Sequence, residues 1–369
     1  MKKAAIVVPT YNEAGTIETL IIDIFEQNKK TPNWELHIVV VDSDSEDKTQ
    51  EIVTNLIKKY PRLHLIKTKK EGLGKAYIEG FTVSIEKLNP YLIFEMDADL
   101  SHDPASIPNF LHKIEKGADF VIGSRYIKGG SIPENWGIHR KILSVVGNLI
   151  IKVGFMKPRI TDWTSGYRAI KSWIVKEASP HIKNYSGYVF QVAFLDYALK
   201  KHAIVAETPI NFKDRNYGVS KLNSFQTIFQ TLLYVFTNSS FVKFVIVGAI
   251  GFVIDFGIFY FLTKFAHLVS WKANLISTET AVLSNFMLNN FWSFAHKKVD
   301  HNKKSYIKGF FKFNLVSSGN IIIQTVGVEI LKALFGIKLL YIYKVAVIVF
   351  IVIPYSYFFY NKVIWKHKR

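Results

Sequence analysis

The chain contains no cysteine among its 369 residues. This absence excludes a disulfide scaffold, a zinc–thiolate centre and a cysteine nucleophile. Acidic residues are also few: 29 Asp and Glu stand against 47 Lys and Arg, so the formal net charge is +18. A chain this basic needs an anionic partner, which is a nucleic acid, a membrane surface or a phosphorylated substrate. The positions of the apolar residues decide among these three.

Apolar residues, by contrast, are abundant. They make up 49% of the chain, aromatic residues make up 15%, and the mean hydropathy is +0.15. This composition excludes a disordered chain, because so large an apolar fraction can bury a core. At about 150 residues per domain, the length predicts two or three domains.

The first part of the chain alternates between short strand-like runs and polar helix-like stretches. The apolar run at residues 4–8 is cut off by Pro9, so it predicts a buried strand and not a signal peptide. Further strands are expected at 37–41, 64–66, 91–96 and 120–123, and helices at 14–28, 48–60, 75–88 and 104–116. The alternation predicts a doubly wound α/β domain with a mostly parallel sheet over residues 1–220. Ligands of such sheets bind beyond the carboxyl ends of the strands.

The last part of the chain, residues 241–369, is dominated by long apolar segments. Residues 241–265, 271–294, 309–335 and 339–365 each exceed the roughly 20 residues that cross hydrocarbon, which predicts an all-α domain of four transmembrane helices. Residues 243–248 resemble 312–317, as expected for two helical hairpins in tandem. Lysines cluster in the middle loop and in the tail, which places both termini and the α/β domain in the cytoplasm. Because this rule already accounts for the lysines, we predict no nucleic-acid partner.

Two stretches with helical apolar spacing, residues 142–155 and 222–236, are flanked by basic residues. Helices of this kind lie flat on an anionic leaflet or pack as ordinary core-facing helices of the soluble domain. The interfacial alternative is favoured for the second stretch, so residues 221–240 are predicted to form an interface helix and linker.

Two carboxylates follow the expected strand at residues 91–96. Asp97 and Asp99 are two residues apart at the carboxyl end of a buried strand, where both side chains leave the sheet edge. Hard oxygen ligands at this spacing suit Mg²⁺ or Mn²⁺, and such an ion also takes phosphate oxygens from a substrate.

A second polar cluster follows the strand at residues 37–41. Asp42, Ser43 and Asp44 can accept hydrogen bonds from a base or a ribose. The alternative is a loop that caps the next helix through Ser45 or Asp47. Residues 72–75 (GLGK) form a glycine-rich turn that suits a phosphate, which is a weak signal by itself.

These motifs occur together and in a fixed order. They are residues 8–13 (VPTYNE), 41–45 (VDSDS), 72–75 (GLGK), 96–102 (MDADLSH) and 123–126 (GSRY). As a set, they closely resemble the polyprenol-phosphate (dolichol-phosphate) mannose synthases of glycosyltransferase family 2. The resemblance covers roughly residues 1–235, and the membrane part resembles GtrA-like domains.

The resemblance implies a GT-A fold and assigns residues to a sugar nucleotide. Carried over motif by motif, the nucleotide-binding residues would be Pro9, Tyr11, Glu13, Val41, Asp42, Ser43, Asp44, Asp97, Ala98, Asp99, Arg215 and Lys221. Position 43 usually holds Asp in this family, so Ser43 leaves the choice between guanine and uracil open. Arg215 and Lys221 match a loop that closes on the donor diphosphate.

The resemblance also assigns a metal site and an acceptor site. Asp97 and Asp99 would bind Mg²⁺ or Mn²⁺, and Ser101 stands where some relatives supply a third ligand. Arg125, Arg140 and Ser144 match positions that grip the acceptor phosphate, and the fork of an arginine suits a phosphate independently. The segment at residues 162–166 (DWTSG) matches a family segment near the acceptor but receives no chemical step. The residues expected to carry catalysis are Asp99, Arg125 and Arg140.

The implied reaction transfers mannose from GDP-mannose to a polyprenyl phosphate with inversion, giving a β-linked product for glycan assembly. The acceptor phosphate is already anionic at neutral pH, so no strong general base is required. One alternative keeps the class and takes UDP-glucose or another sugar nucleotide. Another, of a different class, is a flippase for lipid-linked sugars with a regulatory cytosolic domain.

Overall fold

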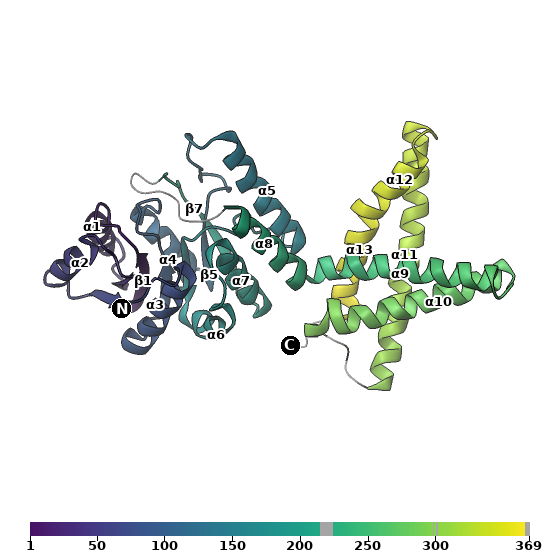
Figure 1. The fold of residues 1–369 in the computed structure, drawn as a ribbon, viewed down its shortest axis with the longest axis horizontal. Coiled ribbons are helices and arrows are strands. Elements are labelled where there is room, and N and C mark those ends of the chain that lie inside the picture. Colours follow the sequence, from purple (N-terminus) through teal and green to yellow (C-terminus); the bar gives the residue numbers. More distant parts are fainter. Residues whose placement is uncertain (215–223, 298, 300–301, 366–369) are drawn as a thin grey trace. The chain divides into compact units, whose positions relative to one another are not determined.

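A computed structural model describes residues 1–214, 224–297, 299 and 302–365 (Figure 1). Two of the predicted site residues, Arg215 and Lys221, lie outside these ranges. The chain divides into two compact units, Met1–Tyr234 and Val235–Arg369.

The first unit contains a seven-stranded sheet in the order β3-β2-β1-β4-β6-β5-β7. The strands are β1 (Lys2–Thr10), β2 (Trp34–Asp42), β3 (Leu63–Lys67), β4 (Leu92–Glu95), β5 (Phe120–Ser124), β6 (Arg168–Lys171) and β7 (Val205–Pro209). Only β6 runs antiparallel to its neighbours β4 and β5. The predicted mostly parallel α/β fold is therefore confirmed. Sequence reasoning did not anticipate β6 and β7, because both are short and carry charged residues.

Helices α1 to α7 are interspersed with these strands along the chain, and α8 follows. They are α1 (Ile17–Asn28), α2 (Thr49–Ile57), α3 (Leu73–Leu88), α4 (Ile107–Glu115), α5 (Ile138–Gly154), α6 (Ser172–Ile182), α7 (Gly187–Lys200) and α8 (Ser224–Asn238). The apolar run at residues 4–8 of β1 is entirely buried. In α1, Ile17, Leu20, Ile21 and Ile24 recur at helical spacing and are fully buried, so one stripe of the helix joins the core.

The topology brings the predicted site together at one edge of the sheet. Strands β1, β2 and β4 are parallel and adjacent, so the loops after Thr10, Asp42 and Glu95 leave the same edge. Asn12, Asp44 and Leu100 in these loops have φ angles of 56°, 59° and 63°. Non-glycine residues rarely adopt this left-handed region, and such conformations cluster at functional sites.

Helix α5 contains the first of the two predicted amphipathic stretches. Its exposed apolar side chains are Ile138, Ile142, Leu143, Val145, Val146, Leu149, Ile150 and Val153. Only Asn148, Ile151 and Gly154 are buried, so a narrow stripe packs on the unit and a wide apolar face does not. An ordinary core-facing helix would bury that wide face.

Helix α8 contains the second stretch, and it crosses the boundary between the units. Its exposed apolar residues are Ile228, Phe229, Leu232, Leu233 and Phe236. On its buried side, the Tyr234 hydroxyl donates a 2.8 Å hydrogen bond to Asp196 of α7. The helix is thus attached to the first unit by one side while presenting apolar residues on another.

The second unit is helical throughout the part that the structure describes. Its main helices are α9 (Ser240–Lys264), α10 (Ser270–Leu288), α11 (Lys303–Phe335), α12 (Leu340–Val347) and α13 (Ile353–Phe359), with one-turn π segments at Asn289–Ser293, Ile348–Val352 and Tyr360–Ile364. Three stretches are long and apolar enough to cross a membrane: Ser240–Lys264, Lys304–Phe335 and Ile342–Ile364.

The remaining predicted span, residues 271–294, is helical as α10 and a π turn but does not meet that standard. Its polar residues, Lys272, Asn274, Thr278, Glu279 and Asn285, dilute its apolar content. The fourth transmembrane helix expected here from the sequence therefore stays a prediction. One of its polar side chains bonds to α9, because Ser277 donates a 2.6 Å hydrogen bond to Asp255.

Candidate active site

The loops after β1 and β2 are joined by hydrogen bonds. The amide of Asn12 donates to Ser45 Oγ at 2.9 Å, and the Asn12 side-chain oxygen accepts from the amide of Glu46 at 2.9 Å. The amide of Glu13 donates to Thr49 Oγ1 at 2.9 Å. The predicted nucleotide residues Tyr11 and Glu13 are therefore held against the Ser43–Thr49 segment by main-chain contacts.

Asp42 lies beneath these loops and is fully buried. Its carboxylate accepts hydrogen bonds from Thr10 Oγ1 (2.9 Å), Ser45 Oγ (2.6 Å) and Gln50 Nε2 (2.6 Å). Its oxygens are thus engaged within the protein, which fits the loop-forming alternative for this residue. Ser43 and Val41 are buried as well, whereas Asp44 is exposed.

Tyr11 is the half-buried aromatic residue of this loop pair. The Lys70 ammonium lies 3.6 Å from the centroid of the Tyr11 ring, within the range of a cation–π interaction. The aromatic ring and the positive charge are together suited to a base and a phosphate.

The turn after β4 places Asp97 and Asp99. Tyr77 donates its hydroxyl hydrogen to Asp97 Oδ1 at 3.2 Å, and the amide of Ser101 donates to Asp99 Oδ1 at 3.1 Å. Burial raises the pKa of Tyr77 well above its usual range, so the phenol keeps the hydrogen that it donates. Ala98 between the two carboxylates is buried.

His102 fixes the same turn from behind. Its Nδ1 accepts a 3.0 Å hydrogen bond from the amide of Asp97, so Nε2 carries the ring hydrogen, 3.8 Å from Asp97 Oδ2. The imidazole is buried and stacks on Tyr167 with ring centroids 4.9 Å apart. Sequence analysis did not assign His102 or Tyr77 to the site. Only the proximity of His102 to the two carboxylates in sequence pointed to it.

The donor set of this turn fits a hard divalent cation. It offers two carboxylates and the buried hydroxyl of Ser101, whose Oγ makes no hydrogen bond within the described part of the chain. Among the described residues, no three His, Cys, Asp or Glu side chains gather as metal ligands. An ion held here would therefore complete its shell with water and substrate oxygens, as Mg²⁺ commonly does.

Two buried ionisable side chains, Glu95 and Arg168, lie opposite each other on the neighbouring strands β4 and β6. Glu95 is fully buried, and its nearest cation, Arg168, places Nε 3.9 Å from Glu95 Oε2. The Arg168 guanidinium instead donates to the carbonyls of Trp163, Ser165 and Gln191 at 2.7–2.9 Å. Burial, only partly opposed by Arg168, raises the pKa of Glu95 to about 8.

Arg125, the first of the predicted acceptor residues, forms an ion pair inside the protein. Its Nε and Nη2 donate to the two Asp162 carboxylate oxygens, both at 2.7 Å, and Nη2 also donates to Thr164 Oγ1 at 2.9 Å. Burial alone would raise the pKa of Asp162, but Arg125 outweighs it and holds that pKa below its usual value. Arg125 is itself only 8% exposed. Sequence reasoning did not foresee that its guanidinium is paired inside the protein.

Ser144 joins this cluster, and Arg140 lies one helical turn before it on α5. Tyr126, next to Arg125, shares a 2.5 Å hydrogen bond with the Ser144 hydroxyl. Arg140 is exposed, with its guanidinium 3.8 Å from the centroid of the Trp136 ring and 3.6 Å from Asp214. The structure thus brings Arg125 and Ser144 together and leaves Arg140 at the surface.

The donor turn and the acceptor cluster meet at Gly166. A side chain added at this glycine would start 3.8 Å from Asp97 Oδ2 and 3.7 Å from the His102 ring. Gly166 ends the segment that begins at Asp162, the partner of Arg125. One loop therefore borders both clusters.

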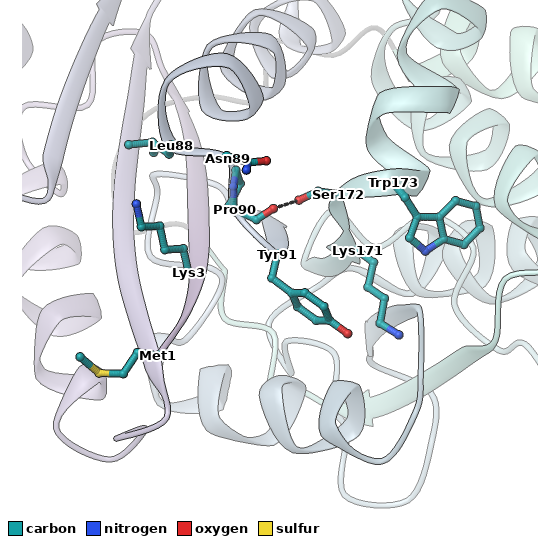
Figure 2. A pocket seen from close by; sticks show the side chains of 9 residues that line it. All are labelled: Met1, Lys3, Leu88, Asn89, Pro90, Tyr91, Lys171, Ser172 and Trp173. Carbon is teal, nitrogen blue, oxygen red and sulfur yellow. Dashed lines mark hydrogen bonds between the residues drawn. The ribbon is translucent and has the colours of Figure 1, made fainter.

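A separate hollow of about 620 Å³ lies at the other end of the sheet. Figure 2 shows its lining, which comes from Met1, Lys3, Leu88, Asn89, Pro90, Tyr91, Lys171, Ser172 and Trp173. Lys3 and Tyr91 stand at the starts of β1 and β4, opposite the ends that carry the predicted site. None of the predicted site residues lines this hollow.

Comparison with known families agrees with this division of the chain. Residues 5–178 match the family model described as glycosyl transferase family 2, and residues 243–365 match the GtrA/DPMS transmembrane domain. The fold and the site thus define a glycosyltransferase that is joined to a membrane domain.

Curated relatives narrow this class. A dolichol-phosphate mannosyltransferase of Pyrococcus furiosus is 33% identical over 332 residues, which is 87% of this chain and 88% of that protein. A polyprenol monophosphomannose synthase of Mycolicibacterium smegmatis is 35% identical over 60% of this chain and 82% of its own. The chain belongs to the family of dolichol- and polyprenol-phosphate mannosyltransferases, as its motifs predicted.

A solved structure is similar at a greater distance. The glucosyl-3-phosphoglycerate synthase of M. tuberculosis is 17% identical, covering 63% of this chain and 80% of that chain, with a TM-score of 0.47.

Proposed function

We propose that this family member transfers mannose from GDP-mannose to a polyprenyl phosphate with inversion at the anomeric carbon. The observation that supports this most strongly is the shared loop at residues 162–166. Asp162 of this loop pairs with Arg125, and Gly166 of the same loop lies next to Asp97, so one loop borders both groups that the reaction would need.

On the donor side, Asp97, Asp99 and Ser101 would hold Mg²⁺ or Mn²⁺. When bound, such an ion supplies charge neutralisation for the leaving diphosphate. Tyr77 and His102 hold the Asp97 carboxylate and its amide in place, so the carboxylate needs little reorganisation. Pro9, Tyr11, Glu13 and Asp44 border the predicted nucleotide pocket. Arg215 and Lys221 keep their predicted role, but they lie outside the described residues.

On the acceptor side, the protein's main task is to align an oxygen that is already anionic. Ser144 and the exposed Arg140 can contact a phosphate directly, and Arg125 contributes positive charge from within its pair with Asp162. Alignment by itself lowers the barrier, because it replaces a bimolecular encounter with a positioned one.

The membrane part would bring the site to its lipid substrate. We propose that α10 crosses the membrane as a fourth helix, packed through its polar residues against α9, with the catalytic unit and both termini in the cytoplasm. The wide apolar face of α5 and that of α8 would lie on the leaflet that holds the acceptor head group.

A transfer assay tests this function. The full-length chain in detergent is incubated with a polyprenyl phosphate, Mg²⁺ or Mn²⁺, and either GDP-mannose or UDP-glucose, with Asp99→Asn as the inactive control. We expect a β-linked mannosyl lipid phosphate from GDP-mannose, with the anomer read by NMR. Preference for UDP-glucose would establish the alternative donor instead, and absence of any transfer would contradict both.

A further inference from the structure

The loop at residues 161–165 has no step in the proposed reaction, yet it is densely bonded. At its start, the amides of Thr161 and Asp162 donate to Glu207 Oε1 of β7 at 2.9 and 3.0 Å. The hydroxyls of Thr161 and Ser124, at the end of β5, are 2.8 Å apart. The start of the loop is therefore fixed to the sheet.

The rest of the loop is bonded to Arg125, to Arg168 and to Asn148 of α5. Asn148 Oδ1 accepts a 2.7 Å hydrogen bond from the amide of Trp163, and its Nδ2 donates to Thr164 Oγ1 at 3.2 Å. Nδ2 also donates to the carbonyl of Ser144 at 2.9 Å. Asn148 is 4% exposed and the Trp163 side chain is fully buried, so water does not readily replace these bonds.

The bonds of Asn148 connect both acceptor groups. Thr164 accepts a hydrogen bond from Arg125 Nη2 with the oxygen that also receives Asn148 Nδ2. Ser144, one turn before Asn148, bonds to Tyr126, the neighbour of Arg125. A displacement of α5 therefore changes the surroundings of Arg125 through the amide of Asn148.

The opposite side of α5 carries the exposed apolar face described above. Asn148 is the polar residue on the narrow buried stripe of this helix, between an unpartnered apolar surface and the Arg125 cluster. This is an unusual position for an asparagine, because a helix interior does not favour it and an apolar residue would pack there as well.

We propose that Asn148 is a positioning residue that links the seating of α5 on a lipid surface to the alignment of Arg125 and Ser144 for the acceptor phosphate. The proposal rests on the proposed function for the identity of the acceptor. It gives the loop at residues 161–165 a role: it transmits the position of a membrane-facing helix to a buried guanidinium.

The test compares the Michaelis constants for the two substrates in Asn148→Ala. Since two or three buried hydrogen bonds are lost, we expect the KM for the polyprenyl phosphate to rise by about tenfold while that for the sugar nucleotide stays within about twofold. Asn148→Asp keeps an acceptor for the Trp163 amide and should recover part of the loss. Ile151→Ala, on the same buried stripe, is the matched control and should leave both constants unchanged.

Thr164→Val provides a second route if Asn148→Ala does not fold. It keeps the Asn148–Trp163 bond, removes the shared oxygen and should also raise only the acceptor constant. An unchanged acceptor constant in the folded variants, or an equal rise for both substrates, overturns the proposal. So does an equal effect of Ile151→Ala.

Direct binding of a short-chain polyprenyl phosphate, measured by calorimetry, separates the two hypotheses. If the wild-type chain binds this phosphate but transfers no sugar, the proposed function fails while the affinities of the variants still test the role of Asn148. If Asn148→Ala binds it as tightly as the wild type, the positioning role fails whatever the donor is.

Discussion

The donor and acceptor sides of the site hold their charged groups differently. On the acceptor side, Arg125 is 8% exposed and forms a two-point ion pair with the fully buried Asp162. On the donor side, Asp97 and Asp99 follow the end of β4, where the Asp97 side chain is 36% exposed and accepts a hydrogen bond from Tyr77. A buried ion pair sets geometry, whereas carboxylates at a sheet edge can meet substrate and metal.

Two aspartates of one motif also differ in their burial and hydrogen bonding. Asp42 and Asp44 both lie at the end of β2, but Asp42 is buried and its carboxylate accepts four hydrogen bonds, whereas Asp44 is exposed. The first therefore shapes the loop, and the second is placed to meet a ligand. The same reasoning ranks the expected effects of substitution.

The largest effect is expected on the donor side. Asp99→Ala should lower the turnover number by at least about a thousandfold, because the loss of one carboxylate costs several kcal/mol of stabilisation of the leaving diphosphate. Circular dichroism and the melting temperature should remain near those of the wild type. Normal turnover by the folded variant would exclude this site.

On the acceptor side, breaking the buried ion pair of Arg125 and Asp162 is expected to lower mainly the stability of the protein. Asp162→Ala leaves the Arg125 guanidinium buried without its partner, which should cost about 3–5 kcal/mol. Denaturant unfolding in detergent measures this change. The matched exposed pair between Arg140 and Asp214 should cost under about 1 kcal/mol when broken by Asp214→Ala. Equal losses of stability in Asp162→Ala and Asp214→Ala would contradict the difference between the buried and the exposed ion pair.

Removal of the membrane unit should leave the catalytic activity but reduce access to an acceptor in a bilayer. A chain ending at residue 238 retains the described donor and acceptor residues and should transfer sugar to a detergent-solubilised acceptor. On vesicles, its rate should fall by about tenfold or more, since a tethered site meets its lipid at a higher effective concentration. Equal rates of both forms on vesicles would refute the tether, and an inactive but folded truncate would mean that the spans build part of the site.

The stability of the folded chain is expected to depend on pH through Glu95. Its pKa is about 8 in the folded protein and 4.5 in the ordinary state, so the folded chain holds the proton more tightly. Relative to Glu95→Gln, the wild type should lose stability as pH rises from about 4.5 to 8, by at most about 1.4 kcal/mol per pH unit. Melting temperatures at pH 6 and pH 8 measure the difference, and parallel pH profiles would contradict it.

The smallest effect is expected for Arg140. Since its side chain is 48% exposed and its ion pair is screened by water, Arg140→Ala should raise the acceptor KM by about two- to fivefold. Steady-state kinetics at low and high salt would check this, because the effect should shrink as salt increases.

Much of the architecture could be predicted from the sequence. The buried runs of β1, β2, β4 and β5 and the polar stretches between them gave the α/β order, and the apolar segments gave the membrane unit. Strands β6 and β7 were missed because four or five residues with charges give no clear alternation. The span expected at residues 271–294 stays a prediction, because the polar residues of α10 lower its apolar content below that of the other three segments.

For the site, the sequence predicted which residues belong to it but not which of them contact one another. Local spacing located Asp97 and Asp99, since both follow one strand. Nothing local indicates that Asp162 lies against Arg125, 37 residues away, or that Asn148 bonds to Trp163. Such pairs depend on how distant loops meet at the sheet edge. For the same reason, the sequence could not tell Asp42, which shapes the loop, from Asp44, which is exposed.

One kinetic comparison tests the division between the two sides most directly. The KM values for sugar nucleotide and polyprenyl phosphate are measured side by side for Asp97→Asn, which neutralises a donor-side carboxylate, and Arg125→Lys, which breaks the two-point ion pair. The division predicts crossed effects: Asp97→Asn weakens the nucleotide in a manner that depends on Mn²⁺ concentration, and Arg125→Lys weakens the lipid phosphate. If both variants weakened the same substrate, the assignment of donor and acceptor sides would be wrong.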